Sequence, residues 1–149
     1  MDRKKTKHIT IRVYAIIINK KNEVLLSDEF RLGMKMTKFP GGGLEFGEGT
    51  IGCLEREAKE EFGQEIEVLE HFYTTDYFQP AMHDDDLQVF SIYYLARFKD
   101  KVKFKISAKA FDFDKLDDGA QSFRWQAIKT LKIEDITLPI DKKVVELLK

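Results

Sequence analysis

Residues 39–63 of the chain read FPGGGLEFGEGTIGCLEREAKEEFG, and they are the strongest indication of the fold in this sequence. After Phe39 and Pro40 comes the glycine run Gly41–Gly43. In its second half the apolar residues recur every three or four positions, which places one apolar face on a helix over residues 51–62. These residues are Ile51, Leu54, Ala58 and Phe62. Thr50 is a credible N-cap, and Gly63 stands where a left-handed C-cap would end the helix.

The same predicted helix carries a crowded set of carboxylates. Glu57 and Glu61 are four positions apart, so their Cβ atoms lie roughly 5 to 6 Å from each other, and Glu60 falls on the same flank. Like charges repel at this spacing, and the helical wheel places Arg56 on the far side of Glu60. We therefore expect a hard divalent cation, magnesium or manganese, against this flank, because clustered Glu oxygens suit these ions.

Gly41–Gly43 adds to this pattern, since glycine lets main-chain groups approach a metal or a phosphate closely. Metal, glycines and carboxylates together favour phosphoryl chemistry. Taken singly, each feature has a plainer explanation. A Glu-rich helix is more often a solvated face, and a glycine run is more often a turn. Their combination at one fixed spacing favours a site.

The spacing of eight residues resembles the signature Gly-x5-Glu-x7-Arg-Glu-U-x-Glu-Glu-x-Gly-U of the Nudix hydrolases, where U is a bulky apolar residue. The matching residues are Gly42, Glu48, Arg56, Glu57, Ala58, Glu60, Glu61 and Gly63. Two positions depart from it: Ala58 is a small apolar residue, and Gln64 stands where an aliphatic residue is usual. The resemblance implies a MutT-like Nudix fold, of class α+β or α/β, with a mixed β-sheet between helices.

The resemblance also implies a metal-binding set. Glu57 and Glu61 look like the principal ligands of Mg²⁺ or Mn²⁺, and Glu60 looks like a further ligand or the base that activates water. The carbonyl oxygen of Gly41 or Gly42 would complete the coordination.

By the same resemblance, Arg56 is the internal salt-bridge partner that orients a carboxylate, and Glu48 shares that network. Members of the family cleave a nucleoside diphosphate linked to another group. A metal ion would neutralise the diphosphate and lower the pKa of an attacking water, while a carboxylate accepts its proton. We therefore expect a metal-dependent pyrophosphohydrolase.

Substrate choice depends on residues outside this stretch. Pro80, sixteen positions after Gln64, resembles the downstream proline of ADP-ribose pyrophosphatases in this family, but a simple turn explains one proline equally well. Tyr77, Phe78 and Trp125 are candidates for stacking on a base or for packing in the core. ADP-ribose or a nucleotide sugar is thus the favoured substrate. A MutT-like nucleoside triphosphate pyrophosphatase and a non-catalytic nucleotide-sensing module remain the alternatives.

The segments before the helix predict strands. Period-two alternation predicts a half-buried strand over 9–18, and a turn at 19–22 leads into a second strand at 23–26, which together read as a hairpin. Residues 27–38 lack clean periodicity and are typical of a connection. A short extended piece is expected over 44–46.

The segments after the helix predict more strands and a second helix. Strands are expected at 65–73, 88–98 and 123–128, with a lysine-alternating edge strand at 102–106. Pro139 suits the first turn of a terminal helix. The apolar stripe of that helix is Ile140, Val144, Leu147 and Leu148.

The composition limits the classes of protein that remain. The chain has 149 residues, of which 43% are hydrophobic and 12% aromatic, so we expect one domain over residues 1–149 with a substantial core. A net charge of −1 argues against general nucleic-acid binding and against binding to membrane surfaces. The segment 99–109, rich in lysine, leaves open a homodimer interface or an edge that faces anions.

The cysteine usage and the N-terminus indicate the compartment. The single cysteine, Cys53, fits a small buried side chain in a reducing cytoplasm. The basic residues Arg3, Lys4, Lys5 and Lys7 precede only a brief apolar run, so we expect no targeting or membrane segment.

Overall fold

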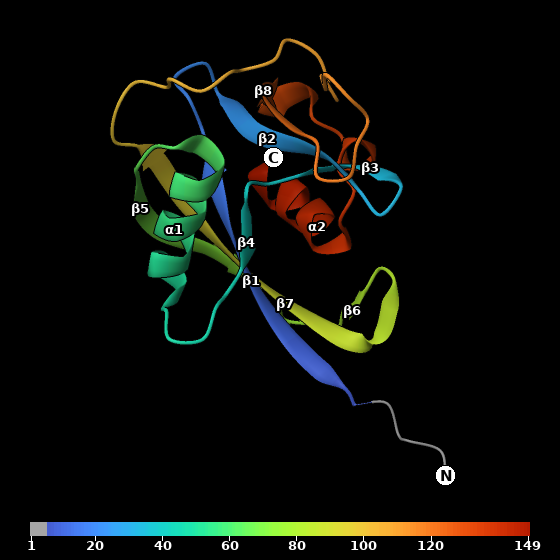
Figure 1. The fold of residues 1–149 in the computed structure, drawn as a ribbon. Coiled ribbons are helices and arrows are strands. Elements are labelled where there is room, and N and C mark those ends of the chain that lie inside the picture. The colour runs from blue at the N-terminus through green and yellow to red at the C-terminus, as the bar shows by residue number, and fades with distance from the viewer. Residues whose placement is uncertain (1–5) are drawn as a thin grey trace.

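The computed structural model describes residues 6–149, and the basic residues Arg3, Lys4 and Lys5 lie outside that range. Its strands and helices follow one another as shown in Figure 1. They are β1 (His8–Ile17), β2 (Glu23–Arg31), β3 (Met34–Lys38), β4 (Gly41–Gly43), α1 (Thr50–Phe62), β5 (Ile66–Thr74), β6 (Pro80–Ala81), β7 (Asp84–Phe98), β8 (Gln121–Ala127) and α2 (Pro139–Leu148). Two 3₁₀ turns, Ile128–Thr130 and Ile133–Asp135, precede α2.

The strands form two sheets. The first has the order β4-β1-β7-β5, with β6 paired to β7, and the second has the order β3-β2-β8. Strands β1 and β7 run parallel, whereas every other pair of named strands is antiparallel. The first sheet is therefore mixed, as expected.

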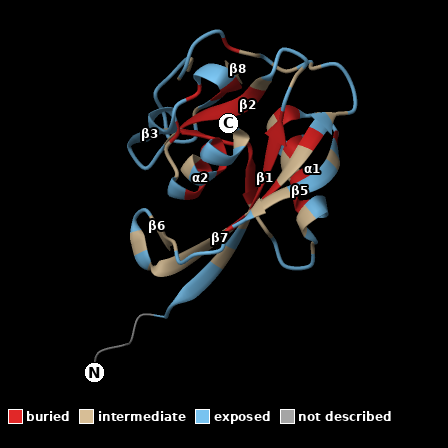
Figure 2. Ribbon diagram, turned by 180° about the vertical axis from the view of Figure 1, so that it is seen from behind, coloured by how far each residue is buried: buried red, intermediate tan, exposed pale blue. Residues whose placement is uncertain are grey.

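The inner half of β1 is buried on both faces, because a helix covers each side. Val13, Ala15 and Ile17 join the apolar cluster that contains the buried face of α1, whereas Tyr14 and Ile16 join the cluster that contains α2. Side chains alternate across a strand, so consecutive residues of β1 face opposite helices. Figure 2 shows this buried centre between the two helices. The predicted arrangement of a mixed sheet between helices is confirmed.

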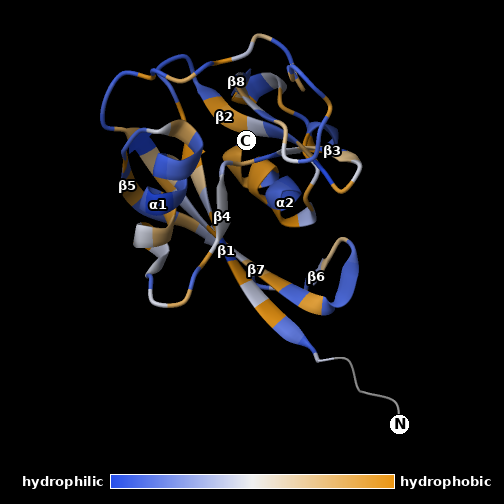
Figure 3. Cartoon of the chain, viewed as in Figure 1, coloured by the Kyte–Doolittle hydropathy of each residue, from blue (hydrophilic) through white to orange (hydrophobic). Residues whose placement is uncertain are grey.

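The outer part of β1 extends away from the helices beside β7 (Figure 1). Along this part, hydrophobic and hydrophilic residues alternate (Figure 3), but the hydrophobic Ile9 and Ile11 are exposed, whereas Thr10 and Arg12 are partly covered.

The predicted hairpin of the first two strands is wrong. The tight turn exists, with the Asn19 side-chain oxygen accepting hydrogen bonds from the amides of Lys21 and Glu23. Beyond it, a single bridge between Ile18 and Val24 joins the strands, which then diverge into separate sheets. The local turn forms, but β1 pairs with β4 and β7, and β2 pairs with β3 and β8.

The connection predicted over 27–38 is also wrong, because β2 continues to Arg31 and pairs with β3. Three polar residues of β2 are buried there: Ser27, Asp28 and Glu29. They are buried because partners from other strands satisfy them, as when Arg124 Nε donates to Asp28 Oδ2 at 2.7 Å. Because these residues are polar, apolar periodicity does not reveal this part of the strand.

The predictions for two shorter extended segments are also wrong. The extended piece lies at β4, over the glycines themselves, and residues 44–46 belong to no strand. No strand forms over 102–106, where the Gln64 side chain donates to the carbonyl of Lys101 and accepts from the amide of Lys103. Phe104 and Ile106 instead pack against the cluster beneath α1.

The helices differ from expectation in detail. Gly49 is the N-cap of α1, and Thr50 is the first helical residue, with its hydroxyl bonded to that of Tyr94. Gly63 is the expected left-handed C-cap, with φ 66°. Ile51 is 49% exposed, and Cys53 takes its place in the buried face. In α2, Leu147 was expected to be buried but is exposed, whereas Val145 is buried.

Candidate active site

Two glycines let strand β4 approach its neighbours closely, Gly41 on the side of β1 and Gly42 on the side of α1. Gly41 has φ 150°, and a Cβ there would overlap the carbonyl of Val13 on the neighbouring strand. A Cβ on Gly42 would overlap the carboxylate of Glu57. The Glu57 side chain is therefore seated directly against the backbone of β4, which only glycine permits.

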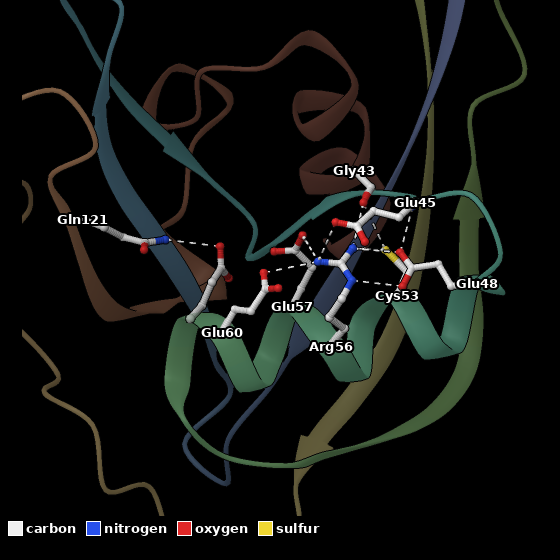
Figure 4. A network of polar contacts seen from close by, with 9 residues as sticks. Gly43, Glu45, Glu48, Cys53, Arg56, Glu57, Glu60 and Gln121 are labelled. Carbon is white, nitrogen blue, oxygen red and sulfur yellow. Dashed lines mark hydrogen bonds and ion pairs between the residues drawn. The ribbon is translucent and has the colours of Figure 1, made fainter.

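Arg56 joins the loop, the strand and the helix (Figure 4). Its Nε and Nη2 donate to the two carboxylate oxygens of Glu48 at 3.0 and 2.8 Å. Nη2 also donates to the carbonyl of Gly43 at 3.0 Å, and Nη1 donates to Glu57 at 3.0 Å and to Glu60 at 3.2 Å. The helical wheel that separated Arg56 from these carboxylates is thus wrong, because the long side chain reaches back along the helix.

This pairing holds Glu48 in its ionised form. Hydrogen bonds from Arg56 and from the backbone of Glu45 lower the pKa of Glu48 to about 2. The Cys53 thiol lies nearby and is buried, and burial with the adjacent Glu48 carboxylate raises its pKa to about 12. Cys53 is therefore a packing residue, as expected, and is inert as a nucleophile at neutral pH.

Glu61 occupies a different environment from Glu48. Its Oε1 accepts a hydrogen bond from Gln121 at 3.4 Å, whereas its Oε2 is buried and has no hydrogen-bond partner in the described structure. Burial raises the pKa of Glu61 to about 7, and the nearby charges of Glu29 and Glu57 contribute. A buried carboxylate oxygen without a partner is costly unless a positive group faces it.

A buried ion pair that the sequence analysis missed lies beside Glu61. Lys38 Nζ is 3.1 Å from Glu29 Oε2, and the two residues are only 6% and 2% exposed. The Lys38 ammonium also lies 5.2 Å from the ring centroid of Tyr14. The sequence offers little signal for this pair, because Glu29 lies between Asp28 and Phe30, and Lys38 lies between Thr37 and Phe39.

These groups open on one cavity of about 750 Å³. Gly41–Gly43, Glu57 and Glu61 line it on the side of α1, and Lys38 and Glu29 line it from the second sheet. The segment 79–83, in and around β6, also contributes to the lining. The structure thus gathers residues from six strands and both helices around a single space.

The cavity also contains a buried carboxylate from α2, which the sequence analysis did not identify. Asp141 is fully buried and accepts hydrogen bonds from the Phe39 amide at 3.3 Å and from the Tyr93 hydroxyl. Burial raises the pKa of Asp141 to about 6. Its position among the apolar residues of α2 was the only sequence signal.

The residues considered for substrate binding separate into two groups. Pro80 lines the cavity. Tyr77 and Phe78 are exposed and are not among the residues that line it. Trp125 packs against the apolar cluster beneath α1, and it does not line the cavity either. Of the two explanations open for Trp125, packing in the core agrees with this position.

The carboxylates fit a divalent cation by their chemistry. Within residues 6–149, no group of three or more His, Cys, Asp or Glu side chains is gathered closely enough to form a metal site. Arg56 is the cation that Glu57 and Glu60 share. Two observations nevertheless suit a metal: the partnerless buried oxygen of Glu61, and the Glu57 carboxylate seated where a Cβ of Gly42 would lie. Oxygen donors of this kind are those that Mg²⁺ and Mn²⁺ prefer.

Comparisons with known proteins agree with the fold. The NUDIX domain matches residues 8–148 of the chain. A NUDIX hydrolase from Nitrosomonas europaea has a TM-score of 0.67 and 21% identity, over 95% of this chain and 87% of that one. A MutT protein from Methanosarcina mazei Go1 has a TM-score of 0.66 and 20% identity, over 97% and 96%.

A third solved structure is an ADP-ribose pyrophosphatase from Streptococcus suis 89-1591, with a TM-score of 0.60 and 16% identity over 93% of this chain and 86% of that one. A sequence search of curated proteins found no match. None of the helices in the described range has the length and apolar character needed to cross a membrane. With the domain match covering nearly the whole chain, the protein belongs to the NUDIX domain family and is a Nudix hydrolase.

Proposed function

We propose that this Nudix hydrolase cleaves the diphosphate linkage of a nucleoside diphosphate joined to another group, with Mg²⁺ or Mn²⁺ as its cofactor. The observation that carries the proposal is the position of Glu57 and Glu61, which line the same cavity as the glycines of β4. That cavity has the size of a small-molecule site. Carboxylates beside a closely approaching backbone suit the metal-assisted hydrolysis of a phosphoanhydride.

Glu57 and Glu61 would hold the metal, with the carbonyl of Gly42 as a further donor. When bound, the cation supplies charge neutralisation for the diphosphate and lowers the pKa of an attacking water. Arg56 keeps the Glu57 carboxylate against β4 through its contacts with Glu48 and Gly43. Arg56 is thus proposed as a positioning residue, and Glu48 as the anchor of its guanidinium.

The reaction adds water to one phosphorus, breaks the bond from that phosphorus to the bridging oxygen, and releases two monophosphates. The water proton passes to a carboxylate of the site. Glu60 is proposed for this step or as a further ligand, since it is exposed on α1 and shares Nη1 of Arg56 with Glu57.

Among substrates, we propose ADP-ribose or a nucleotide sugar as the first to examine. Pro80 and its neighbours line the cavity on the side formed by β6, which supports a role in substrate choice for the proline that resembles the one in ADP-ribose pyrophosphatases. The exposed positions of Tyr77 and Phe78 remove one argument for base stacking at those residues. Pro80 is therefore the feature on which this choice depends.

The test is a hydrolysis screen with Mg²⁺ over ADP-ribose, nucleotide sugars, dinucleoside polyphosphates and nucleoside triphosphates, with products identified by mass spectrometry. The proposal expects two monophosphates from ADP-ribose or a nucleotide sugar. Preference for triphosphates, with release of pyrophosphate, would replace this substrate with the MutT-like alternative. Tight nucleotide binding without any turnover would identify a sensing module. Glu55→Gln is the matched control for the site variants, because Glu55 is exposed on α1 and does not line the cavity.

A further inference from the structure

Two arginines flank β4, and they differ in how their donors are used. Arg56 is on the α1 side and donates to three carboxylates and to the carbonyl of Gly43, as described above. Arg12 is on β1, directly opposite Gly43 in the strand pairing, and its Nη1 is 3.7 Å from where a Cβ of Gly43 would lie. Both guanidinium groups thus lie near Gly43.

Arg12 is held in place but not saturated. Its Nε donates to the hydroxyl of Tyr14 at 2.6 Å, and its guanidinium carbon lies 5.6 Å from the centroid of the Tyr14 ring. Within residues 6–149, neither Nη1 nor Nη2 of Arg12 makes a hydrogen bond, and Arg12 has no ion pair there. The side chain of Arg12 lines the cavity together with that of Tyr14.

The other cations of the cavity are already paired. Lys38 is buried against Glu29, and Arg31 Nε donates to the other oxygen of the same carboxylate at 3.0 Å. Both charges therefore serve to hold Glu29 in the second sheet. Arg31 also keeps Nη1 and Nη2 without a hydrogen bond, but its side chain is 63% exposed and its Nε is paired with Glu29. Within residues 6–149, Arg12 is the one of these three cations that has no carboxylate partner.

Neighbouring groups, two carboxylates among them, keep the Arg12 guanidinium charged. Burial lowers the pKa of Arg12, but Tyr14, Glu57 and Glu29 raise it by more, so the guanidinium stays charged and lies near the proposed metal ligand Glu57. A planar guanidinium with two free nitrogens matches two oxygens of one phosphate. A diphosphate lying across β4 would meet the carboxylate side at one end and Arg12 at the other.

We propose that Arg12 is a substrate-binding residue, donating through Nη1 and Nη2 to non-bridging phosphate oxygens of the nucleotide, with Tyr14 as the residue that positions it. This inference rests on the proposed function, because it assumes a phosphate-bearing substrate in this cavity. The phosphate charge is present in both the ground state and the transition state. Loss of Arg12 should therefore raise KM more than it lowers kcat.

The experiment measures binding of inorganic pyrophosphate to the full-length protein in EDTA, by isothermal titration calorimetry, so that neither the base nor turnover affects the readout. Arg12→Met should weaken pyrophosphate binding by roughly 10-fold or more, the scale of a lost charge-assisted hydrogen bond. Arg12→Lys should weaken it less, because one ammonium keeps the charge but loses the two-point geometry.

Tyr14→Phe and Arg97→Met are the companion variants. Tyr14→Phe keeps the Arg12 charge and removes only the hydroxyl that fixes it, so an intermediate loss of pyrophosphate affinity is expected. Arg97 pairs with Glu67 at 2.8 Å on an exposed part of the sheet and does not line the cavity, so Arg97→Met should bind as the wild type does. Circular dichroism is used to check that each variant is folded. If Arg12→Met does not fold, the pyrophosphate affinities of Arg12→Lys and Tyr14→Phe are compared with that of the wild type instead.

The outcomes separate this inference from the proposed function. Equal pyrophosphate affinity in the wild type and in the Arg12 and Tyr14 variants overturns the inference, as does a wild type that binds no pyrophosphate. A wild type that binds pyrophosphate through Arg12 but hydrolyses no nucleotide supports the inference and overturns the proposed function. A wild type that hydrolyses a nucleotide without any dependence on Arg12 overturns only the inference.

Discussion

Arg56 and Glu48 form a two-point ion pair across the loop between β4 and α1. Nε and Nη2 of the guanidinium meet the two oxygens of one carboxylate, and the same group also reaches Gly43 and Glu57. One side chain therefore connects the loop, the glycine strand and the carboxylate helix. This pair keeps the three segments of the site together.

Replacing Arg56 should cost both stability and activity. Arg56→Ala leaves Glu48 and the Gly43 carbonyl without their donor, so the free energy of unfolding in urea should fall by roughly 1 to 3 kcal/mol. Arg56→Lys should recover only part of this loss, because lysine cannot make the two-point contact. Arg97→Ala, which breaks an exposed pair, should change stability by less than about 1 kcal/mol. Equal effects of Arg56→Ala and Arg97→Ala would contradict this assignment.

Glu61→Gln should separate chemistry from folding. The change removes a proposed metal ligand but relieves charge repulsion beside Glu57 and Glu29, so turnover should fall by roughly 100-fold or more while stability is kept. Steady-state kinetics and urea unfolding on the same preparation measure the two effects. Glu55→Gln serves as the control and should retain full turnover. Retained turnover in Glu61→Gln would show that the reaction does not need Glu61 as a metal ligand.

Magnesium should stabilise the folded protein. A ligand that binds only the folded state at a hundred times its Kd contributes about 2.7 kcal/mol, which for a chain of this length raises Tm by several degrees. The double variant Glu57→Gln, Glu61→Gln should lose this rise in differential scanning fluorimetry. EDTA should abolish turnover and leave the circular dichroism spectrum of the wild type unchanged. Full turnover after exhaustive chelation would refute the metal assignment.

Gly42→Ala should inactivate the enzyme by moving Glu57. A Cβ at position 42 would overlap the Glu57 carboxylate, so that side chain must leave its place against β4. We expect a loss of kcat of at least roughly 10-fold, since misplaced catalytic groups are costly. Gly52→Ala is the matched control, because no atom lies within 4 Å of a Cβ there and alanine favours a helix. It should raise the free energy of unfolding by roughly 0.5 to 1 kcal/mol, and a similar gain in Gly42→Ala would be inconsistent with the geometry.

Asp141 should make stability depend on pH. Its pKa is about 6 in the folded protein against an ordinary value of 3.8, so the folded chain keeps a proton that the unfolded chain has released between these values. The contribution is full below about pH 3.8 and is lost as the pH rises through about 6, by at most about 3 kcal/mol. Asp141→Asn removes this titration, so the variant should gain stability relative to the wild type between pH 4 and pH 8. A constant difference in unfolding free energy across that range would contradict the prediction.

The parts of the fold that are governed by short-range periodicity could be predicted. The residues of α1 from Leu54 to Phe62, its glycine C-cap and residues 88–98 of strand β7 follow from side-chain spacing along a few turns or pleats, which needs no distant partner. The signature residues from Gly42 to Gly63 could be located for the same reason, because they lie within 22 consecutive positions. The start of β7 at Asp84 was not predicted, because its first residues are acidic.

The parts that depend on distant partners could not be predicted. Glu29 and Lys38 are polar residues that a sequence pattern assigns to the surface, but they are buried because each neutralises the other. The helical wheel also failed for Arg56, since it follows the Cα positions and ignores the reach of a long side chain.

Side-chain spacing alone shows that α1 is amphipathic, that Glu57 and Glu61 share one flank of it, and that glycines precede it. Which surfaces meet those carboxylates, and therefore where the cavity lies, depends on tertiary packing. Asp141 reaches the amide of Phe39 from the last helix, Arg12 reaches Gly43 across a strand pair, and Gln121 reaches Glu61 from β8. Such contacts depend on strand register and on the packing of both faces of β1, and these are set by the burial of the whole core rather than by any local run of residues.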